Sequence, residues 1–269
     1  MSVKELLEKG VNLFQNEEFE HAKHALNSAL ELDKENLDVL NFLGLTHIHL
    51  DDPKQALEYF GRAVVIDEDD EIVWNNMGDA HAILDENEKA LSCFEKALTI
   101  NVSYGNAYFN KGLVLADLGR FEEAHECFSK AIEFNEDQEK VDAYYEQALV
   151  YIEEERFNEA LENIDLAEGL MESAELTNLR ATCYDHLERY EEALKLYESV
   201  ESKAEEDELL ADIYYNKSFT LISLDRKEDA VKNLIQAVKL LPEIKEDVID
   251  NELLMELNGI GDFNTYFAN

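Results

Sequence analysis

Four glycines follow one another at intervals of 34 residues: Gly10, Gly44, Gly78 and Gly112. Two alanine registers keep the same interval: Ala22, Ala56, Ala90 and Ala124, and then Ala29, Ala63, Ala97 and Ala131. Three small-residue registers with one period indicate a chain built from a repeating structural unit. Such a chain is expected to form a repeat array, which usually offers a surface for binding rather than a reaction site.

The composition predicts that this unit is helical. The chain has only 2 prolines and 10 glycines, and it lacks the alternating Val, Ile and Thr runs that are typical of strands. The first residues, MSVKELLEKGVNLF, lack the basic start and apolar run of a signal peptide. No apolar stretch reaches membrane-spanning length, and the three cysteines form no CxxC pair. We therefore expect a soluble, cytoplasmic protein whose cysteines are small buried hydrophobic residues.

The second repeat shows the expected internal structure. Leu40, Leu43 and His47 have the spacing of one face of a helix. The turn that follows contains Asp51 and Asp52, and Pro53 stands where a second helix would begin. A second helical stripe then follows, formed by Ala56, Phe60, Ala63 and Val64. Each repeat is accordingly predicted to be a pair of amphipathic helices joined by a short turn.

This pattern resembles the tetratricopeptide repeat (TPR), a helix–turn–helix unit of 34 residues. The family places a small residue at position 8 of the unit, which here is Gly10, Gly44, Gly78, Gly112, Ala148, Ala181 and Ser218. It places alanine at position 20, which here is Ala22, Ala56, Ala90, Ala124, Ala160, Ala193 and Ala230. Position 24 favours an aromatic residue and holds Leu26, Phe60, Phe94, Phe128, Ile164, Tyr197 and Leu234. The small residues let the two helices of a repeat approach closely, and we expect the residue at position 24 to fill the space between one repeat and the next.

The resemblance implies an all-α fold, a right-handed superhelical solenoid that forms a single domain over residues 3–244. The seven repeats are predicted at 3–36, 37–70, 71–104, 105–138, 141–174, 174–207 and 211–244. Glu139 and Lys140 look inserted before the fifth repeat, and residues 205–210 lengthen the sixth, through a longer helix or loop. The alternative is a local change in the pitch of the superhelix. A capping helix is predicted over 245–258, and residues 259–269 form a tail that is either loose or docked.

The charge balance is strongly acidic. With 62 acidic and 23 basic residues, the formal net charge is −39 at pH 7. This argues against binding to nucleic acid or to an anionic membrane, because both require a basic surface. The charge either attracts cationic partners or serves only solubility and salt adaptation, and the sequence leaves both readings open.

No catalytic or metal-binding motif is found. The chain has no glycine-rich phosphate loop, no GxSxG and no HExxH. His21 and His24 are three residues apart but have no evident third ligand. His47 and His81 share a packing position in successive repeats, and the DEDDE run at 67–71 lacks the spacing of an EF-hand. We expect no enzymatic activity, no metal and no cofactor.

In TPR proteins the first helix of each repeat lines a concave groove, mainly through positions 2, 5, 6, 9, 12 and 13. Carried onto this chain, these positions give a candidate peptide-binding groove made of Asn75, Asn76, Asp79, Asn106, Phe109, Asn110, Leu113, Asp142, Tyr145, Glu146, Asn178, Asp212, Tyr215 and Asn216. Asparagine amides both donate and accept, so a row of them suits the backbone of an extended peptide; the alternative is that they are polar filler on a concave wall. None of these residues is lysine or arginine, which argues against the binding of a C-terminal carboxylate that some family members perform.

The sequence therefore predicts a non-enzymatic scaffold or adaptor that binds a protein or extended peptide in this groove. The acidic groove favours an unstructured partner segment rich in Lys or Arg. A monomer is favoured. The alternative is a homo-oligomer that assembles through its end repeats or through the tail, which carries Phe263, Tyr266 and Phe267.

Overall fold

The computed structural model describes residues 1–202, 204, 206–251 and 253–267. Within these residues the chain contains α-helices and one 3-10 helix, and no strand. The expected all-α helical repeat fold is confirmed. The chain divides into two compact units, Met1–Ala143 (unit 1) and Tyr144–Asn269 (unit 2), and the boundary lies inside helix α9.

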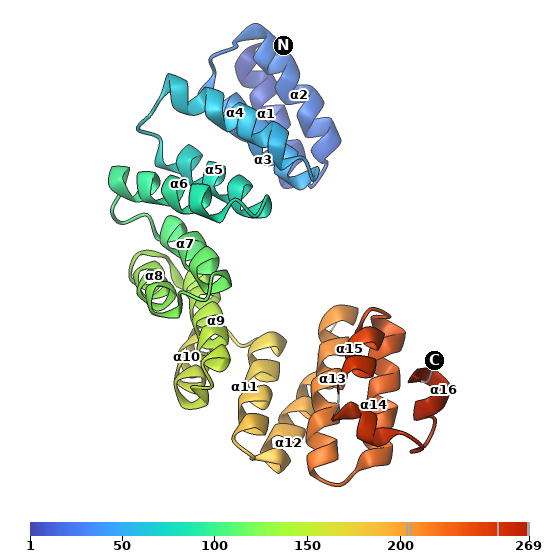
Figure 1. The fold of residues 1–269 in the computed structure, drawn as a ribbon. Helices are drawn as coiled ribbons and strands as arrows, with labels where there is room; N and C mark the ends of the chain where they lie inside the picture. Colours follow the sequence, from blue (N-terminus) through green and yellow to red (C-terminus); the bar gives the residue numbers. More distant parts are fainter. Residues whose placement is uncertain (203, 205, 252, 268–269) are drawn as a thin grey trace. The chain divides into compact units, whose positions relative to one another are not determined.

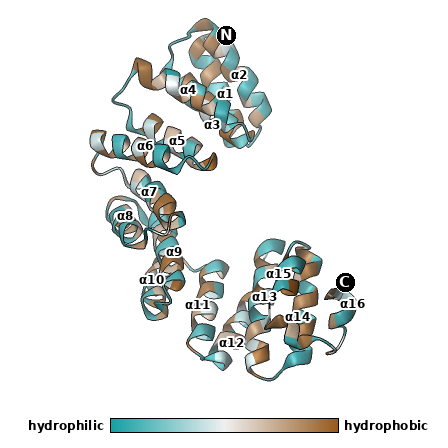
Figure 2. Cartoon of the chain, viewed as in Figure 1, coloured by the Kyte–Doolittle hydropathy of each residue, from teal (hydrophilic) through white to brown (hydrophobic). Residues whose placement is uncertain are grey.

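Unit 1 consists of antiparallel helix pairs (Figure 1). Its helices are α1 (Val3–Gln15), α2 (Phe19–Leu32), α3 (Leu37–His49), α4 (Pro53–Ile66), α5 (Glu71–Ile83), α6 (Asn87–Ile100), α7 (Gly105–Asp117) and α8 (Phe121–Phe134), followed by the first part of α9 (Asp137–Glu153). The helices of each pair pack together, and α2, α4 and α6 each pack against the first helix of the next pair. The first helices also contact one another, α1 with α3, α3 with α5 and α5 with α7. The helices carry polar and apolar faces (Figure 2), as helices half buried in a stack must.

The repeated glycines are the points of closest contact between the two helices of a pair. A Cβ atom built on Gly78 would lie 2.5 Å from Cε1 of Phe94, and one on Gly112 would lie 2.8 Å from Cε1 of Phe128. Gly44 faces Phe60 in the same way. In these three repeats the residue at position 24 therefore packs over the glycine of its own repeat. We had expected it to fill the space between one repeat and the next. Phe60 also shares a core cluster with Val73 and Ala80 of the next pair, so it serves both contacts.

The turn inside each repeat has a left-handed residue at the same position. In unit 1 the backbone φ is positive at Glu17, Asp51, Asp85 and Gly119, and in unit 2 at Glu155, Glu188 and Asp225. Only one of these residues is glycine, although this conformation costs other residues about 1 kcal/mol. The turn is held by backbone bonds, such as Glu17 N to Phe14 O at 2.9 Å and Glu18 N to Leu13 O at 2.9 Å. The predicted opening of a helix at Pro53 is confirmed, with Asp52 as the N-cap residue.

Unit 2 contains the rest of α9 and the helices α10 (Phe157–Leu170), α11 (Ala174–His186), α12 (Tyr190–Glu201), α13 (Asp207–Ser223) and α14 (Lys227–Leu240). Helices α9 and α13 have 17 residues each, whereas α1, α3, α5, α7 and α11 have 13. The extra residues before the fifth pair lengthen its first helix, one of the two outcomes expected for them. Residues 207–210 belong to the first helix of the seventh pair, whereas we expected residues 205–210 to lengthen the sixth repeat. Of the residues 205–210, Glu205 lies outside the described part of the chain.

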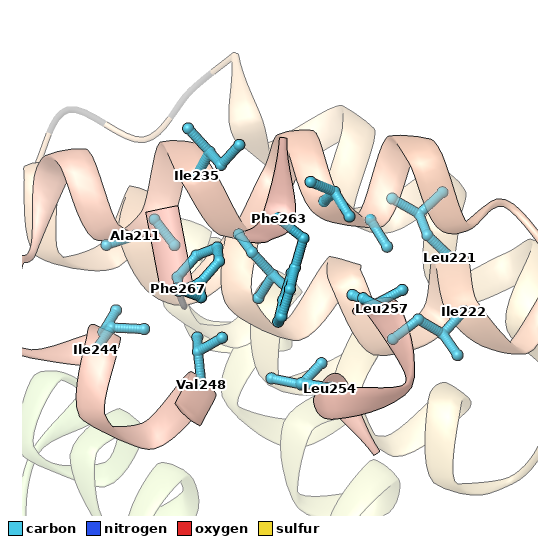
Figure 3. Packing of buried hydrophobic residues seen from close by; sticks show 14 of the residues in the cluster. Ala211, Leu221, Ile222, Ile235, Ile244, Val248, Leu254, Leu257, Phe263 and Phe267 are labelled. Atoms are coloured by element: carbon cyan, nitrogen blue, oxygen red, sulfur yellow. The ribbon is translucent and has the colours of Figure 1, made fainter. Parts of the chain in front are cut away.

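The C-terminal cap, residues 244–267, closes unit 2. It comprises α15 (Ile244–Asp250), the 3-10 helix η1 (Leu254–Leu257) and α16 (Phe263–Phe267). The single helix predicted over 245–258 is interrupted after Asp250, where the Asn251 side chain accepts from the backbone of Leu253 and Leu254. The tail is docked as far as residue 267, and residues 268–269 lie outside the described part. Val248, Leu254, Leu257, Phe263 and Phe267 point into one apolar cluster with α13 and α14 (Figure 3).

Candidate functional site

In unit 1 the predicted groove residues of α5 and α7 form a chain of hydrogen bonds. Nδ2 of Asn76 donates to Oδ1 of Asn41 on α3 at 2.9 Å. Nδ2 of Asn110 on α7 donates to Oδ1 of Asn75 at 3.1 Å and to Oδ1 of Asp79 at 2.7 Å. Nδ2 of Asn75 donates to the other oxygen of Asp79 at 3.4 Å. The amides link three successive first helices, and we name the set Asn41, Asn75, Asn76, Asp79 and Asn110 the amide ladder.

The ladder changes what its amides offer to a ligand. Asn75 is 4% exposed and Asn76 is 9% exposed, and both amide hydrogens of Asn110 are donated inside the protein. The sequence placed these residues together, but it did not show that they bond to one another. A peptide backbone would have to replace some of these hydrogen bonds. Alternatively, its carbonyl oxygens could accept from the second amide hydrogen of Asn76, for which the ladder has no acceptor.

Asp79 is the charged member of the ladder. In the described part of the chain it pairs with no Lys or Arg, and burial raises its pKa to about 7. Its charge in turn contributes to a raised pKa of Tyr104, after the larger effect of burial. Asp79 is thus a half-buried carboxylate that is ionised only in part near neutral pH.

This pKa predicts how Asp79→Asn changes stability with pH. Because the folded state holds the proton of Asp79 up to about pH 7 and the unfolded state loses it near its ordinary pKa of about 3.9, stability from this group falls as the pH rises between these values. The wild type should therefore lose stability relative to Asp79→Asn between about pH 5 and pH 8, by a few kcal/mol at most. Urea unfolding at both pH values measures this difference.

Asp117→Asn is the control, since Asp117 is an exposed acid in the same unit. A pH-independent difference between the wild type and Asp79→Asn would contradict the raised pKa.

The remaining predicted residues of unit 1 are spread along α7 and the start of α9. Asn106 and Asp142 are exposed, and Phe109 and Leu113 are half-buried. The ring of Phe109 lies 6.0 Å from the ring of Phe128, so part of its surface belongs to the core.

In unit 2 the predicted residues lie on three first helices: Tyr145 and Glu146 on α9, Asn178 on α11, and Asp212, Tyr215 and Asn216 on α13. Burial raises the pKa of Tyr145, and the charges of Glu146, Glu175 and Asp212 add to the shift. Burial also raises the pKa of Asp212.

Oδ1 of Asn178 is buried and has no hydrogen-bond partner in the described residues. Tyr215 packs edge-on against Phe219 at 5.2 Å, and burial raises its pKa, with a smaller contribution from Asp247 of the cap.

A cleft of about 450 Å³ opens in unit 2, which we name the cap cleft. Its walls come from α11, α12, α13 and the cap: Thr182, Asp185, His186, Glu188, Tyr190, Tyr197, Asn216, Phe219, Ser223 and Leu253. Only Asn216 belongs to the predicted groove. Thr182, Asp185, His186, Phe219 and Ser223 stand at groove positions 9, 12 and 13, so the repeat register contained a signal for them. Leu253 belongs to the cap and has no counterpart in the repeat pattern.

No group of three or more metal-ligating side chains is found in the part of the chain that the structure describes. His21 instead contacts Glu18 at 3.0 Å, and His81 contacts Glu86 at 2.6 Å. Within the acidic run at 67–71, Asp70 is the N-cap residue of α5 and Asp67 accepts from the backbone of Asp69. No described helix is both long and apolar enough to cross a membrane.

Stacked helix pairs, each packed against the next, define a helical repeat protein. Sequence models of the tetratricopeptide repeat match residues 7–71, 69–137, 109–170 and 211–243. The chain therefore belongs to the tetratricopeptide repeat family, whose members generally act as non-enzymatic interaction scaffolds. No curated protein matches the sequence.

Solved structures agree on the fold. A tetratricopeptide repeat protein from Parabacteroides merdae has a TM-score of 0.68 and 20% identity, over 95% of this chain and 96% of that chain. PilW, a type IV pilus biogenesis factor, has a TM-score of 0.70 and 18% identity, over 77% of this chain and 96% of that chain. YrrB, a TPR protein with an unusual peptide-binding site, has a TM-score of 0.56 and 25% identity, over 76% of this chain and 100% of that chain. What the three structures share with this chain is the helical repeat fold.

Proposed function

We propose that this protein is a non-enzymatic, cytoplasmic adaptor that binds an extended, Lys- or Arg-bearing segment of a partner protein at the groove positions of its first helices. The observation that carries the proposal is the charge of these positions. From α3 to α13 they hold acids and amides but no Lys or Arg, and Lys4 on α1 is the exception. The peptide-binding site of YrrB, a structural relative, supports a peptide as the ligand.

Two features suit an extended cationic segment. Acidic side chains such as Asp142 and Asp212 accompany aromatic ones such as Tyr145 and Tyr215, which offer contact area with a polar tip. The net charge of −39 attracts a cationic segment over a distance and raises its association rate. The same charge disfavours nucleic acid and anionic lipid as partners.

The alternative, assembly through the tail, loses support from the fold. Phe263 is 1% exposed and Phe267 is 3% exposed, because both are buried against their own chain. Only Tyr266, at 39%, keeps a substantial exposed surface among the three aromatic residues of the tail. We propose a monomer as the binding form.

Fluorescence anisotropy with a labelled peptide of alternating Lys, Gly and Ser tests the proposal. Binding should weaken roughly tenfold when the salt concentration rises from about 50 mM to about 300 mM, because screening shortens the reach of the charges. Asp142→Lys should weaken it further at low salt.

Glu126→Lys is the matched control, since it makes the same charge change at an exposed position on the second helix α8. A peptide that binds equally well at both salt concentrations, or that responds equally to both variants, would count against groove binding. The same peptide with Glu in place of Lys should not bind.

A further inference from the structure

The cap cleft has a mixed lining and is large enough to admit a long side chain. Its volume of about 450 Å³ falls within the range of small-ligand sites. Three of its walls are helices of unit 2, and Leu253 of the cap supplies another. The inference drawn from it rests on the proposed binding of a cationic segment and specifies which side chain the cleft takes.

Two hydroxyl groups that line the cleft can act only as acceptors toward a ligand. Oγ1 of Thr182 donates to the carbonyl oxygen of Asn178 at 3.2 Å. The hydroxyl of Tyr197, 3.2 Å from Oγ1 of Thr182, must then donate its own hydrogen to Thr182. Both hydroxyl hydrogens are used inside the protein, so the two oxygens offer only lone pairs to a ligand.

Asp185 gives the cleft a half-buried carboxylate. No described Lys or Arg pairs with it, and its Oδ1 atom is buried without a hydrogen-bond partner in the described residues. Burial raises its pKa, while the hydroxyl of Thr220 and the charge of His186 lower it, so its ionised form is compensated only in part. A cationic group that enters the cleft would add to that compensation.

The side walls suit an aliphatic chain that ends in a cation. The rings of Tyr190 and Phe219 are half-buried and line the cleft together with Leu253. The ring of His186 is stacked on Phe157 at 4.7 Å and 5°, so its place at the rim is fixed. Aromatic faces attract cations, and apolar walls bury the methylene groups of a long side chain.

We propose that the cap cleft binds the side chain of a lysine of the partner segment, with its ammonium group on Asp185. The geometry favours lysine over arginine. A guanidinium binds a carboxylate best through two parallel hydrogen bonds, but Oδ1 of Asp185 is buried, so only Oδ2 is left to face the cleft. An ammonium needs one carboxylate oxygen, and its other hydrogens suit the hydroxyl oxygens of Thr182 and Tyr197.

The test uses n-butylammonium chloride, the head of a lysine side chain, titrated into the full chain and followed by amide NMR. The cleft predicts saturable shifts confined to residues 182–190 and 216–223, with a dissociation constant in the millimolar range for so small a ligand. Asp185→Asn should weaken binding about tenfold. n-Butanol and n-propylguanidinium should bind more weakly than n-butylammonium.

Two variants keep the result interpretable. Glu198→Gln removes an exposed acid from α12 in the same unit and should leave the titration unchanged. Leu253→Lys places an ammonium at the wall of the cleft and should abolish binding of the probe without loss of the fold, which the melting temperature checks. Equal binding of n-butanol, or unchanged binding to Asp185→Asn, would overturn the lysine site.

This probe separates the two proposals. If n-butylammonium binds as expected but the Lys, Gly and Ser peptide does not, the proposed function fails and the ammonium site stands. If the peptide binds with the expected salt dependence but the probe shows no saturable shift, the lysine site fails and the proposed function stands.

Discussion

Replacing Phe94 by alanine is expected to lower the free energy of unfolding by about 3–5 kcal/mol. Phe94 is 0% exposed and lies against Gly78 of the same helix pair. Its removal takes away the buried ring and leaves a cavity between α5 and α6 that helix backbones cannot close without moving. Urea unfolding followed by circular dichroism measures the loss.

Gly78, which lies against the ring of Phe94, provides a second test of this contact. In a helix, alanine is favoured over glycine by about 1 kcal/mol. Gly78→Ala should nevertheless destabilise the protein by about 1–2 kcal/mol, because its Cβ would lie 2.5 Å from Phe94 and force the ring or the helices to move. In a chain that already carries Phe94→Ala, the same substitution should stabilise by about 1 kcal/mol.

Gly61 provides the matched control. It lies inside α4, and a Cβ atom built on it meets nothing within 4 Å. Gly61→Ala should therefore stabilise the protein by up to about 1 kcal/mol. If Gly78→Ala and Gly61→Ala shift the unfolding midpoint equally, close contact with the residue at position 24 is not the reason why glycine recurs at position 8 of the repeat.

The period of 34 residues predicted the helices well, because close packing requires a small residue at each repeat of the contact. It predicted the turns less well. Six of the seven left-handed turn residues are Asp or Glu rather than glycine, so composition gave no sign of that conformation. Local backbone bonds hold the turn, and no side-chain pattern reports them.

The candidate site could also be predicted from the sequence only in part. The repeat register placed Asn75, Asn76 and Asn110 on one side of their helices, but pairing between the amides depends on the offset between neighbouring helices. That offset follows from packing and not from spacing along the chain. The wall that Leu253 adds to the cap cleft could not be predicted from the repeat pattern. Leu253 follows the break after Asp250, where the predicted continuous helix does not form.

The second large effect is expected in the C-terminal cap. Phe263→Ala should destabilise unit 2 by about 3–5 kcal/mol, since Phe263 is 1% exposed and packs with Phe267, their ring centroids 4.8 Å apart. Tyr266→Ala, at a residue that is 39% exposed, should cost much less. Hydrogen exchange over 207–240 measures the loss, because α13 and α14 share the apolar cluster of the cap.

The same variant distinguishes a docked tail from one that joins two chains. Burial within one chain contributes to stability independently of protein concentration, whereas burial in a second copy contributes by mass action. The wild-type melting temperature should therefore stay constant over a hundredfold range of concentration, and Phe263→Ala should lower it by the same amount throughout. A melting temperature that rises with concentration in the wild type and not in Phe263→Ala would instead place Phe263 in an interface between chains. Light scattering on both proteins would then show a loss of mass in the variant, which an intramolecular cap does not predict.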